Sequence, residues 1–382
     1  MNTRIRRIIS VCGIIIFIVG ATTLAIGIQF VASANTSSPP GPTAQEHLDM
    51  LIFVSPQYAN DLEIEDSINS YIKAVKKDLN WNTRIITITQ EMNNYLAIDN
   101  IIEEYYSLHP LKACIFVGED TNTPLAGDSN NLEKPSTVPW FTIKGTSAYE
   151  MSEQGIVCQQ YTMDICISLL YPTSSLDYEI KKSQILTAFD KFTTRRVSTF
   201  SNKIAVFESS DINMFSKELY QTIALNENLE YFEDPTSIEI SNSLIDSYLM
   251  YFVHGHSNPS GSVINANEKV WFSANNIDEL NTPLFGADGC YVGGWWSDQT
   301  DNNILDPSNE RSWYGSKIFT GQYIQVMVLG MLSQNGYSSS VSFIENVVPE
   351  LLDEKTLAEA MIGDFTFGDT IIVGDPTFHF TV

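Results

Sequence analysis

The chain has 382 residues, 43% of them hydrophobic, and its 46 acidic against 21 basic residues give a formal net charge of −25. This apolar content is too high for a chain that is disordered throughout, and the length suits one large domain or two smaller ones sharing a sheet. The acidic excess argues against nucleic acid as a partner, because a polyanion would be repelled, and it fits a charged extracellular surface.

The N-terminus carries a targeting element over residues 1–34. Three arginines within the first seven residues precede an uncharged stretch, of which Ile8 to Ile28 is long enough to cross a bilayer as a helix. Either this stretch is a membrane anchor with its basic end in the cytoplasm, or it is a long signal peptide cleaved after Ala32-Ser33-Ala34. We favour the anchor, because the apolar region of a signal peptide usually spans only about 7–15 residues.

Residues 35–46, which begin NTSSPPGP, have the composition of a linker. In both alternatives the rest of the chain is exported, either as the extracellular part of a membrane protein or, after cleavage, as a secreted protein. Its cysteines are too sparse for a disulfide framework, although Cys158 and Cys166 could pair in an oxidising compartment. Cys114, inside the apolar run ACIFV, is expected to be a buried hydrophobic residue.

Residues 47–200 alternate strand and helix signals. Apolar runs predict strands at 48–54, 84–89 and 113–118, and apolar residues at helical spacing predict helices over 64–79 and 98–105. This β-α-β-α-β order predicts a parallel sheet with helices on its faces. The Pro- and Asn-rich residues 121–139 are expected to form surface loops.

A second α/β round occupies residues 201–382. Its expected strands are 203–207, 248–253, 284–287, 323–330 and 370–374, and its expected helices lie over 213–225, 341–352 and 355–362. The sequence therefore predicts an α/β fold with mainly parallel strands flanked by helices, arranged as two adjoining subdomains, 47–200 and 201–382.

Two expected strands of the second subdomain lead into residues that can do chemistry. His254 follows the apolar run YLMYFV, and Cys290 follows LFGADG. Open parallel sheets bind ligands outside the carboxyl ends of their strands, so neighbouring strands would bring imidazole and thiol to the same rim. A nucleophile and an acid/base group are the minimum for acyl transfer, and the N–H groups of Gly255 and Cys290 could stabilise an oxyanion.

The residues alone leave other roles open for this pair. A histidine after an apolar strand is often only a satisfied polar cap, and a cysteine near glycines is often structural. His254, His256 and Cys290 are also ligands of the type that zinc takes. No acidic ligand cluster with a recognisable spacing stands near them, and we predict no metal site.

The blocks YFVHGH and FGADGCYVGGW resemble the histidine and cysteine blocks of the gingipain family of cysteine peptidases, which belongs with caspases and legumains. ACIFVGEDTNTPL, KTLAEAMI and IIVGDPTFHF resemble further blocks of that family, in family order. Glu119 intervenes before Asp120 in the first of these, and Ala358 replaces a glycine in the second. The Ile-Gly-Arg block that the family usually carries after Met-Asp is absent after Asp164, so a preference for basic residues is not carried over.

The resemblance implies a caspase-like sandwich in which Cys290 is the nucleophile and His254 protonates the leaving amine. It makes His256 a rim residue, and we assign His256, Asp288, Trp295 and Trp296 to the substrate groove as a hypothesis. Both tryptophans stand in the loop GGWWSDQTDNN and could equally pack beneath the rim. Asp288 is not assigned as a catalytic partner, because a carboxylate close to a thiol raises the thiol's pKa.

These expectations combine into an exported, membrane-tethered cysteine endopeptidase that forms an acyl-enzyme on protein or peptide substrates and requires no cofactor. The resemblance allows calcium as a structural ion, but no segment spells a contiguous calcium loop and no ligands are named. Two alternatives stay open: a catalytically silent member that binds a surface partner through the same groove, and a transpeptidase that uses the same dyad.

Overall fold

A computed structural model describes most of the chain beyond residue 46. The described residues are 47–89, 92, 95–118, 125–128, 131–135, 148–152, 155–160, 163–172, 177–194, 203–212, 229–258, 261–289, 317–331, 343–363 and 370–380. The chain divides into two units, residues 1–42 and 43–382, and all described residues belong to the second. The predicted membrane segment and the whole linker, residues 35–46, therefore lie outside the described residues. Within the described ranges, no helix combines the length and apolarity that crossing a bilayer requires.

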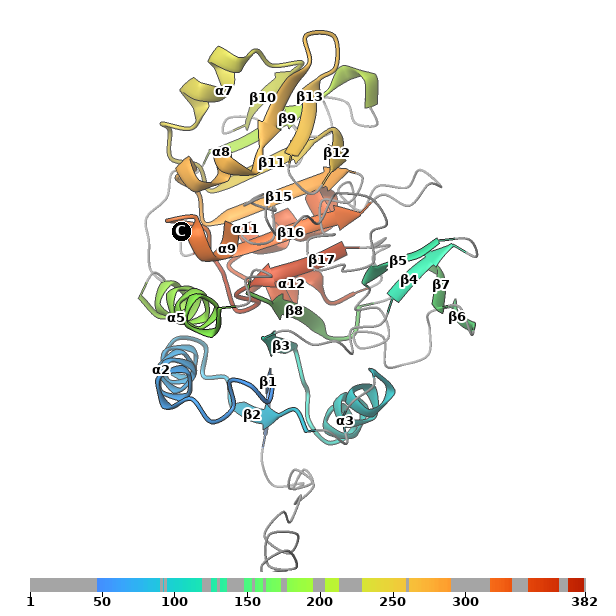
Figure 1. Ribbon diagram of the computed structural model, residues 1–382, viewed down its shortest axis with the longest axis vertical. Helices are drawn as coiled ribbons and strands as arrows, with labels where there is room; N and C mark the ends of the chain where they lie inside the picture. Colours follow the sequence, from blue (N-terminus) through green and yellow to red (C-terminus); the bar gives the residue numbers. More distant parts are fainter. Residues whose placement is uncertain are drawn as a thin grey trace, which may run out of the picture. The chain divides into compact units, whose positions relative to one another are not determined.

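A ten-stranded sheet forms the centre of the second unit (Figure 1). Its strand order is β10-β9-β11-β15-β16-β17-β8-β3-β1-β2. The bounds are β1 Met50–Val54, β2 Thr83–Thr87, β3 Ala113–Val117, β8 Cys166–Leu170, β9 Ile204–Glu208, β10 Leu229–Glu233, β11 Met250–His254, β15 Leu284–Gly289, β16 Val326–Met331 and β17 Thr370–Gly374. The sheet runs continuously through both expected subdomains, and the boundary between them stays a prediction.

The sheet consists of two parallel blocks joined back to back. Strands β10, β9, β11, β15 and β16 are mutually parallel, and so are β17, β8, β3, β1 and β2. The two blocks meet where β16 and β17 pair antiparallel. The fold is therefore α/β with a mostly parallel sheet, and the carboxyl ends of the two blocks lie at opposite edges of it.

Helices flank this sheet. Beside the strands β8, β3, β1 and β2, α2 (Leu62–Leu79) and α5 (Tyr178–Thr194) lie side by side on one face of the sheet. Helix α3 (Tyr95–Leu108) lies on the other face (Figure 1). The remaining helical segments are η2 Ser210–Ile212, α7 Ser237–Ser243, α8 Ala274–Glu279, α9 Lys317–Thr320, η3 Phe343–Val347, α11 Val348–Leu352 and α12 Leu357–Met361. The predicted helix over 213–225 lies outside the described residues.

The described residues form two smaller sheets in addition to the central one. One has the order β5-β4-β7-β6, with β4 Leu125–Asp128, β5 Asn131–Pro135, β6 Ala148–Ser152 and β7 Gly155–Gln160. The other is antiparallel, with β12 His256–Asn258, β13 Gly261–Asn265 and β14 Val270–Ser273. The expectation that 121–139 are loops is wrong for β4 and β5. The sequences of β4 and β5 lack the alternating apolar pattern of a strand. These strands are defined by backbone pairing with each other and, for β4, with β7, which local sequence does not reveal.

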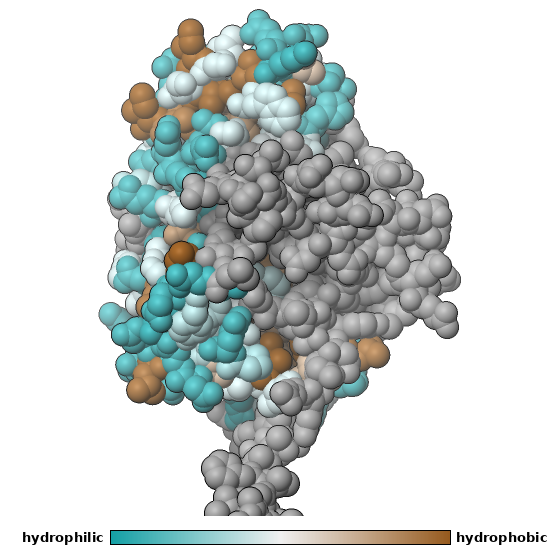
Figure 2. All heavy atoms as spheres, viewed as in Figure 1, coloured by the Kyte–Doolittle hydropathy of each residue, from teal (hydrophilic) through white to brown (hydrophobic). Residues whose placement is uncertain are grey.

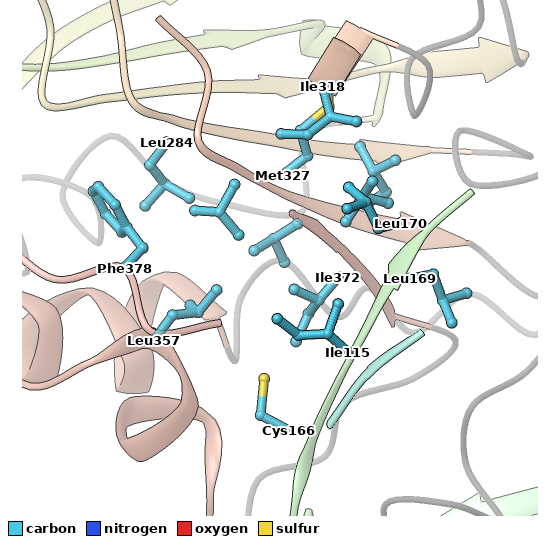
Figure 3. Close-up of a cluster of buried hydrophobic side chains, with 14 of the residues drawn as sticks. Ile115, Cys166, Leu169, Leu170, Leu284, Ile318, Met327, Leu357, Ile372 and Phe378 are labelled. Atoms are coloured by element: carbon cyan, nitrogen blue, oxygen red, sulfur yellow. The ribbon is translucent and has the colours of Figure 1, made fainter. Parts of the chain in front are cut away.

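The hydrophobic core continues across the junction of the two blocks. Figure 3 shows Ile115, Cys166, Met327 and Ile372 in one buried cluster, with residues from β3, β8, β16 and β17. Cys114 and Cys166 are buried free thiols, so Cys166 does not pair with Cys158. Burial raises the pKa of both thiols, which makes them structural hydrophobic groups.

The described surface is mostly hydrophilic on the face shown in Figure 2, with apolar side chains gathered at the end that carries α7. Ile238 of α7 and Ile245 just after it are exposed. Isolated exposed apolar side chains are normal on a protein surface.

Candidate functional site

The carboxyl edge of the block formed by β10, β9, β11, β15 and β16 brings three titratable residues into one row. His254 is the last residue of β11, Glu208 is the last residue of β9, and Asp288 is the fifth residue of β15. In the sheet register, His254 lies opposite Glu208 on one side and opposite Asp288 on the other. Side chains in register on parallel strands point to the same face, so these three share one face at the strand ends.

The adjacency of the two chemistry-bearing strands, expected from the sequence, is confirmed. β11, which ends at His254, is hydrogen-bonded directly to β15, whose last residue Gly289 precedes Cys290 in the chain. The crossover between them contains the three-stranded sheet and α8. Cys290 itself lies outside the described residues, as do Trp295 and Trp296.

His254 forms a buried pair with a carboxylate that the sequence did not single out. Its Nδ1 lies 3.0 Å from Oε1 of Glu208, and both side chains are fully buried. A carboxylate at this distance accepts a hydrogen bond from the Nδ1–H group, which favours the tautomer protonated at Nδ1 and leaves Nε2 as the nitrogen that exchanges a proton with a reacting group. This is the arrangement that orients a histidine for general acid–base work.

Glu208 is held in turn by the neighbouring strand β10. The hydroxyl of Tyr231 donates to Oε2 of Glu208, so each carboxylate oxygen has its own partner. Burial and the adjacent carboxylate raise the pKa of Tyr231. The phenol therefore keeps its proton and remains a donor across the physiological pH range.

Gly255 and Gly289 allow the strand ends to approach closely. A Cβ at Gly289 would lie 2.1 Å from Oγ of Ser257 and 2.4 Å from the carbonyl oxygen of Gly255, so no larger residue fits there. The Gly255 N–H, expected to bind an oxyanion, donates to the Asp288 carbonyl at 3.3 Å. This bond is long, and it would have to open before the N–H could donate to a substrate oxygen.

The predicted groove residues differ in their surroundings. His256 is exposed on the rim, with its Nε2 3.2 Å from Oδ2 of Asp211. Asp288 is only 1% exposed, so it does not line an open groove in this structure. His254 is also fully buried, so a substrate can reach its imidazole only after the residues that cover it move.

Among the described residues, no group of three histidine, cysteine, aspartate or glutamate side chains has a geometry that could hold a metal ion. The zinc alternative includes Cys290 and is therefore not tested by this observation. Calcium ligands were not named from the sequence, and the described residues add none.

Sequence reasoning missed Glu208 and Tyr231 for different reasons. Glu208 ends the apolar run IAVFE, and an acidic residue at the mouth of a buried strand is the same signal that marked His254. Tyr231 stands in LEYFE, a half-exposed strand at the edge of the sheet without a continuous apolar run. Because the sequence did not predict β10, it gave no reason to place Tyr231 near Glu208.

Comparison with known proteins leaves the family of this chain open. No family model matches it, and no curated protein matches it. One match among solved structures is a sugar transporter from Clostridium phytofermentans, with 10% sequence identity over 86% of this chain and all of that chain, at a TM-score of 0.18. A TM-score this low supports no conclusion about fold or function.

Proposed function

We propose that this protein is a membrane-tethered, exported cysteine endopeptidase that acts through Cys290 and His254 on protein or peptide substrates. The observation that carries the proposal is the buried His254–Glu208 pair at the carboxyl edge of a parallel sheet. The strand that presents His254 is hydrogen-bonded to the strand that leads into Cys290. The gingipain resemblance of the sequence around both residues supports the same assignment and, with it, a caspase-like arrangement of the sheet.

The reaction follows from the roles of these groups. The Cys290 sulfur, its proton passed to Nε2 of His254, attacks the scissile carbonyl carbon and forms a C–S bond while the carbonyl oxygen becomes an oxyanion. Collapse of this intermediate breaks the C–N bond, and Nε2 returns the proton to the leaving amine. Water then attacks the thioester, His254 takes the water's proton, and release of the carboxylic acid restores the thiol.

Glu208 contributes electrostatically rather than by receiving the proton. Its carboxylate accepts the Nδ1 hydrogen bond at 3.0 Å and stabilises the imidazolium that forms during each half-reaction. The Cys290 N–H and the Gly255 N–H, once released from Asp288, would stabilise the oxyanion. No metal or cofactor takes part in these steps.

The complete burial of His254 favours one alternative, a catalytically silent member that binds a surface partner. Transpeptidation uses the same acyl-enzyme and differs only in the nucleophile that resolves it, which is an amine in place of water. Product analysis therefore separates all three functions.

The test is turnover of a quenched-peptide library by the full-length protein, with products identified by mass spectrometry, with and without an added amine. We expect cleavage that Cys290→Ala abolishes, that His254→Ala lowers by about 10³-fold, and that His256→Ala lowers far less. Ligation to the added amine would indicate a transpeptidase. No turnover by the wild type, or turnover that persists in Cys290→Ala, would contradict the peptidase assignment.

A further inference from the structure

We infer that Tyr231 is a positioning residue of this site, which acts through Oε2 of Glu208 to hold Oε1 against Nδ1 of His254. The catalytic consequence rests on the proposed function, whereas the effect on the imidazole does not. The contact that carries this role is the hydrogen bond from the Tyr231 hydroxyl to Oε2 of Glu208. The action of Tyr231 is exerted entirely through the Glu208 carboxylate.

The register of three adjacent strands builds this relay. β10, β9 and β11 are consecutive in the sheet, and Glu208 lies opposite both His254 on β11 and Glu233 on β10. Tyr231 precedes Glu233 by two positions, so its side chain lies on the same face of the sheet as Glu208. Its long side chain reaches along that face, and its hydroxyl donates to Oε2.

The two hydrogen bonds on Glu208 fix a torsion that is otherwise soft. The terminal torsion of a glutamate is broad, and a carboxylate with one partner can rotate at little cost. With Tyr231 on Oε2 and His254 on Oε1, rotation of the buried Glu208 carboxylate breaks at least one of these bonds. A buried acceptor that loses its donor is strongly destabilised, so the pair of bonds keeps the carboxylate in one orientation.

Other charged groups around His254 do not replace this contact. Of the described residues, Asp288 lies in register with His254 on β15, on the side opposite Glu208. At the rim, His256 and Asp211 pair with each other at 3.2 Å. Nδ1 of His254 lies 3.0 Å from Oε1 of Glu208, and the orientation of that carboxylate decides which imidazole nitrogen carries the proton.

The same sheet provides a matched control. Tyr248 is buried, whereas Tyr231 is half-buried, and the Tyr248 hydroxyl likewise donates to a glutamate, at 2.7 Å from Oε2 of Glu230. Burial raises the pKa of Tyr248 as it does that of Tyr231. Tyr248 lies two residues before β11 and six before His254, roughly 20 Å away along an extended chain, so Tyr248→Phe removes a comparable Tyr–Glu bond at a distance from the site.

The experiment records the imidazole ¹⁵N signals and the Nδ1 proton resonance of His254 in the full-length protein, in which five histidines are labelled. His254→Asn assigns the signal. We expect wild type and Tyr248→Phe to show a single tautomer protonated at Nδ1. In Tyr231→Phe we expect a mixed tautomer population and an upfield Nδ1 proton. Unchanged His254 signals in Tyr231→Phe would overturn the inference.

Two further measurements separate this inference from its alternatives. In turnover assays, Tyr231→Phe should lower kcat about tenfold with little change in KM, and it should have no further effect in a Glu208→Gln background. If Tyr231→Phe does not fold, 3-fluorotyrosine at position 231 keeps the hydroxyl as a stronger donor, and an unshifted Nδ1 proton then refutes the role. If the wild type has no turnover, the proposed function fails, but the ¹⁵N signals still decide the role of Tyr231.

Discussion

At the scale of single residues, the site combines His254, which the sequence analysis selected, with Glu208 and Tyr231, which it did not. His254 stands out because a glycine and a second histidine follow it at the end of an apolar run. Glu208 ends an apolar run as His254 follows one, but only the sheet register shows that the two residues lie opposite each other. A strand order cannot be read from local sequence, so the partner of a catalytic histidine on another strand cannot be either. Cys290 remains a prediction, since it lies outside the described residues.

In the proposed mechanism, the negative charge of Glu208 stabilises the imidazolium form of His254. Glu208→Gln keeps a side chain of the same shape and an oxygen that can accept from Nδ1, but it removes the negative charge beside the imidazolium. We expect kcat/KM for peptide cleavage to fall about 10²-fold or more. Glu230→Gln, which alters a carboxylate paired with Tyr248 and Lys203, is the control and should leave kcat/KM within about twofold. Equal activities of the two variants would exclude Glu208 from the mechanism.

At the scale of single elements, strong local patterns were read correctly and context-dependent ones were not. Predicted strands at 48–54, 113–118 and 370–374 match β1, β3 and β17 within two residues at either end. Helix α2 was expected from its apolar spacing, and its buried residues Ile64, Ile68, Tyr71 and Val75 are those that the spacing selects. β8, β10, α5 and the three-stranded sheet were missed. β10 is half exposed and is defined by its pairing with β9 rather than by its own pattern.

The N-terminus of α2 shows how a helix start can be tied to its neighbour. Asp61 accepts from the N–H groups of Glu63 and Ile64, and it also binds Lys182 and Tyr178 of α5, each at 2.8 Å. The hydrogen bond from Lys182 is the main cause that lowers the pKa of Asp61 to about 2. Because this pKa lies below the ordinary value of 3.8, the ionised carboxylate stabilises the fold above that value. The stabilisation is lost as the pH falls through about 2.

Asp61→Asn isolates this charge, since asparagine is also a good N-cap. We expect the variant to lose about 1 kcal/mol in free energy of unfolding at pH 6, and the difference from wild type to vanish as the pH falls from about 4 to 2. Asp61→Ala should lose about 1 kcal/mol more at all of these pH values, because it removes the cap itself. Urea unfolding across pH measures both. A wild-type advantage over Asp61→Asn that is constant or grows toward pH 2 would contradict the assignment.

At the scale of the whole molecule, the antiparallel meeting of β16 and β17 decides where a site can form. The sequence predicted mainly parallel strands but could not locate the antiparallel pair, because nothing in a strand's local pattern reports the direction of its neighbour. β17 comes last in the chain, yet it lies between β16 and β8 and joins the two blocks, with its Gly374 carbonyl accepting from Ser168. As a result Gly118, directly after β3, lies at the opposite edge of the sheet from His254.

We propose above all that Cys290 is a nucleophile and that His254 is its acid–base partner, at the edge of the sheet where β11 and β15 end. Intact-mass analysis of the full-length protein after exposure to a panel of peptidyl acyloxymethyl ketones tests it most directly, because these reagents label an activated thiol that has a substrate-binding cleft. We predict one adduct per chain in wild type, no adduct in Cys290→Ala, and labelling slowed by orders of magnitude in His254→Ala but not in His256→Ala. An unlabelled wild type, or an adduct that persists in Cys290→Ala, would contradict the account.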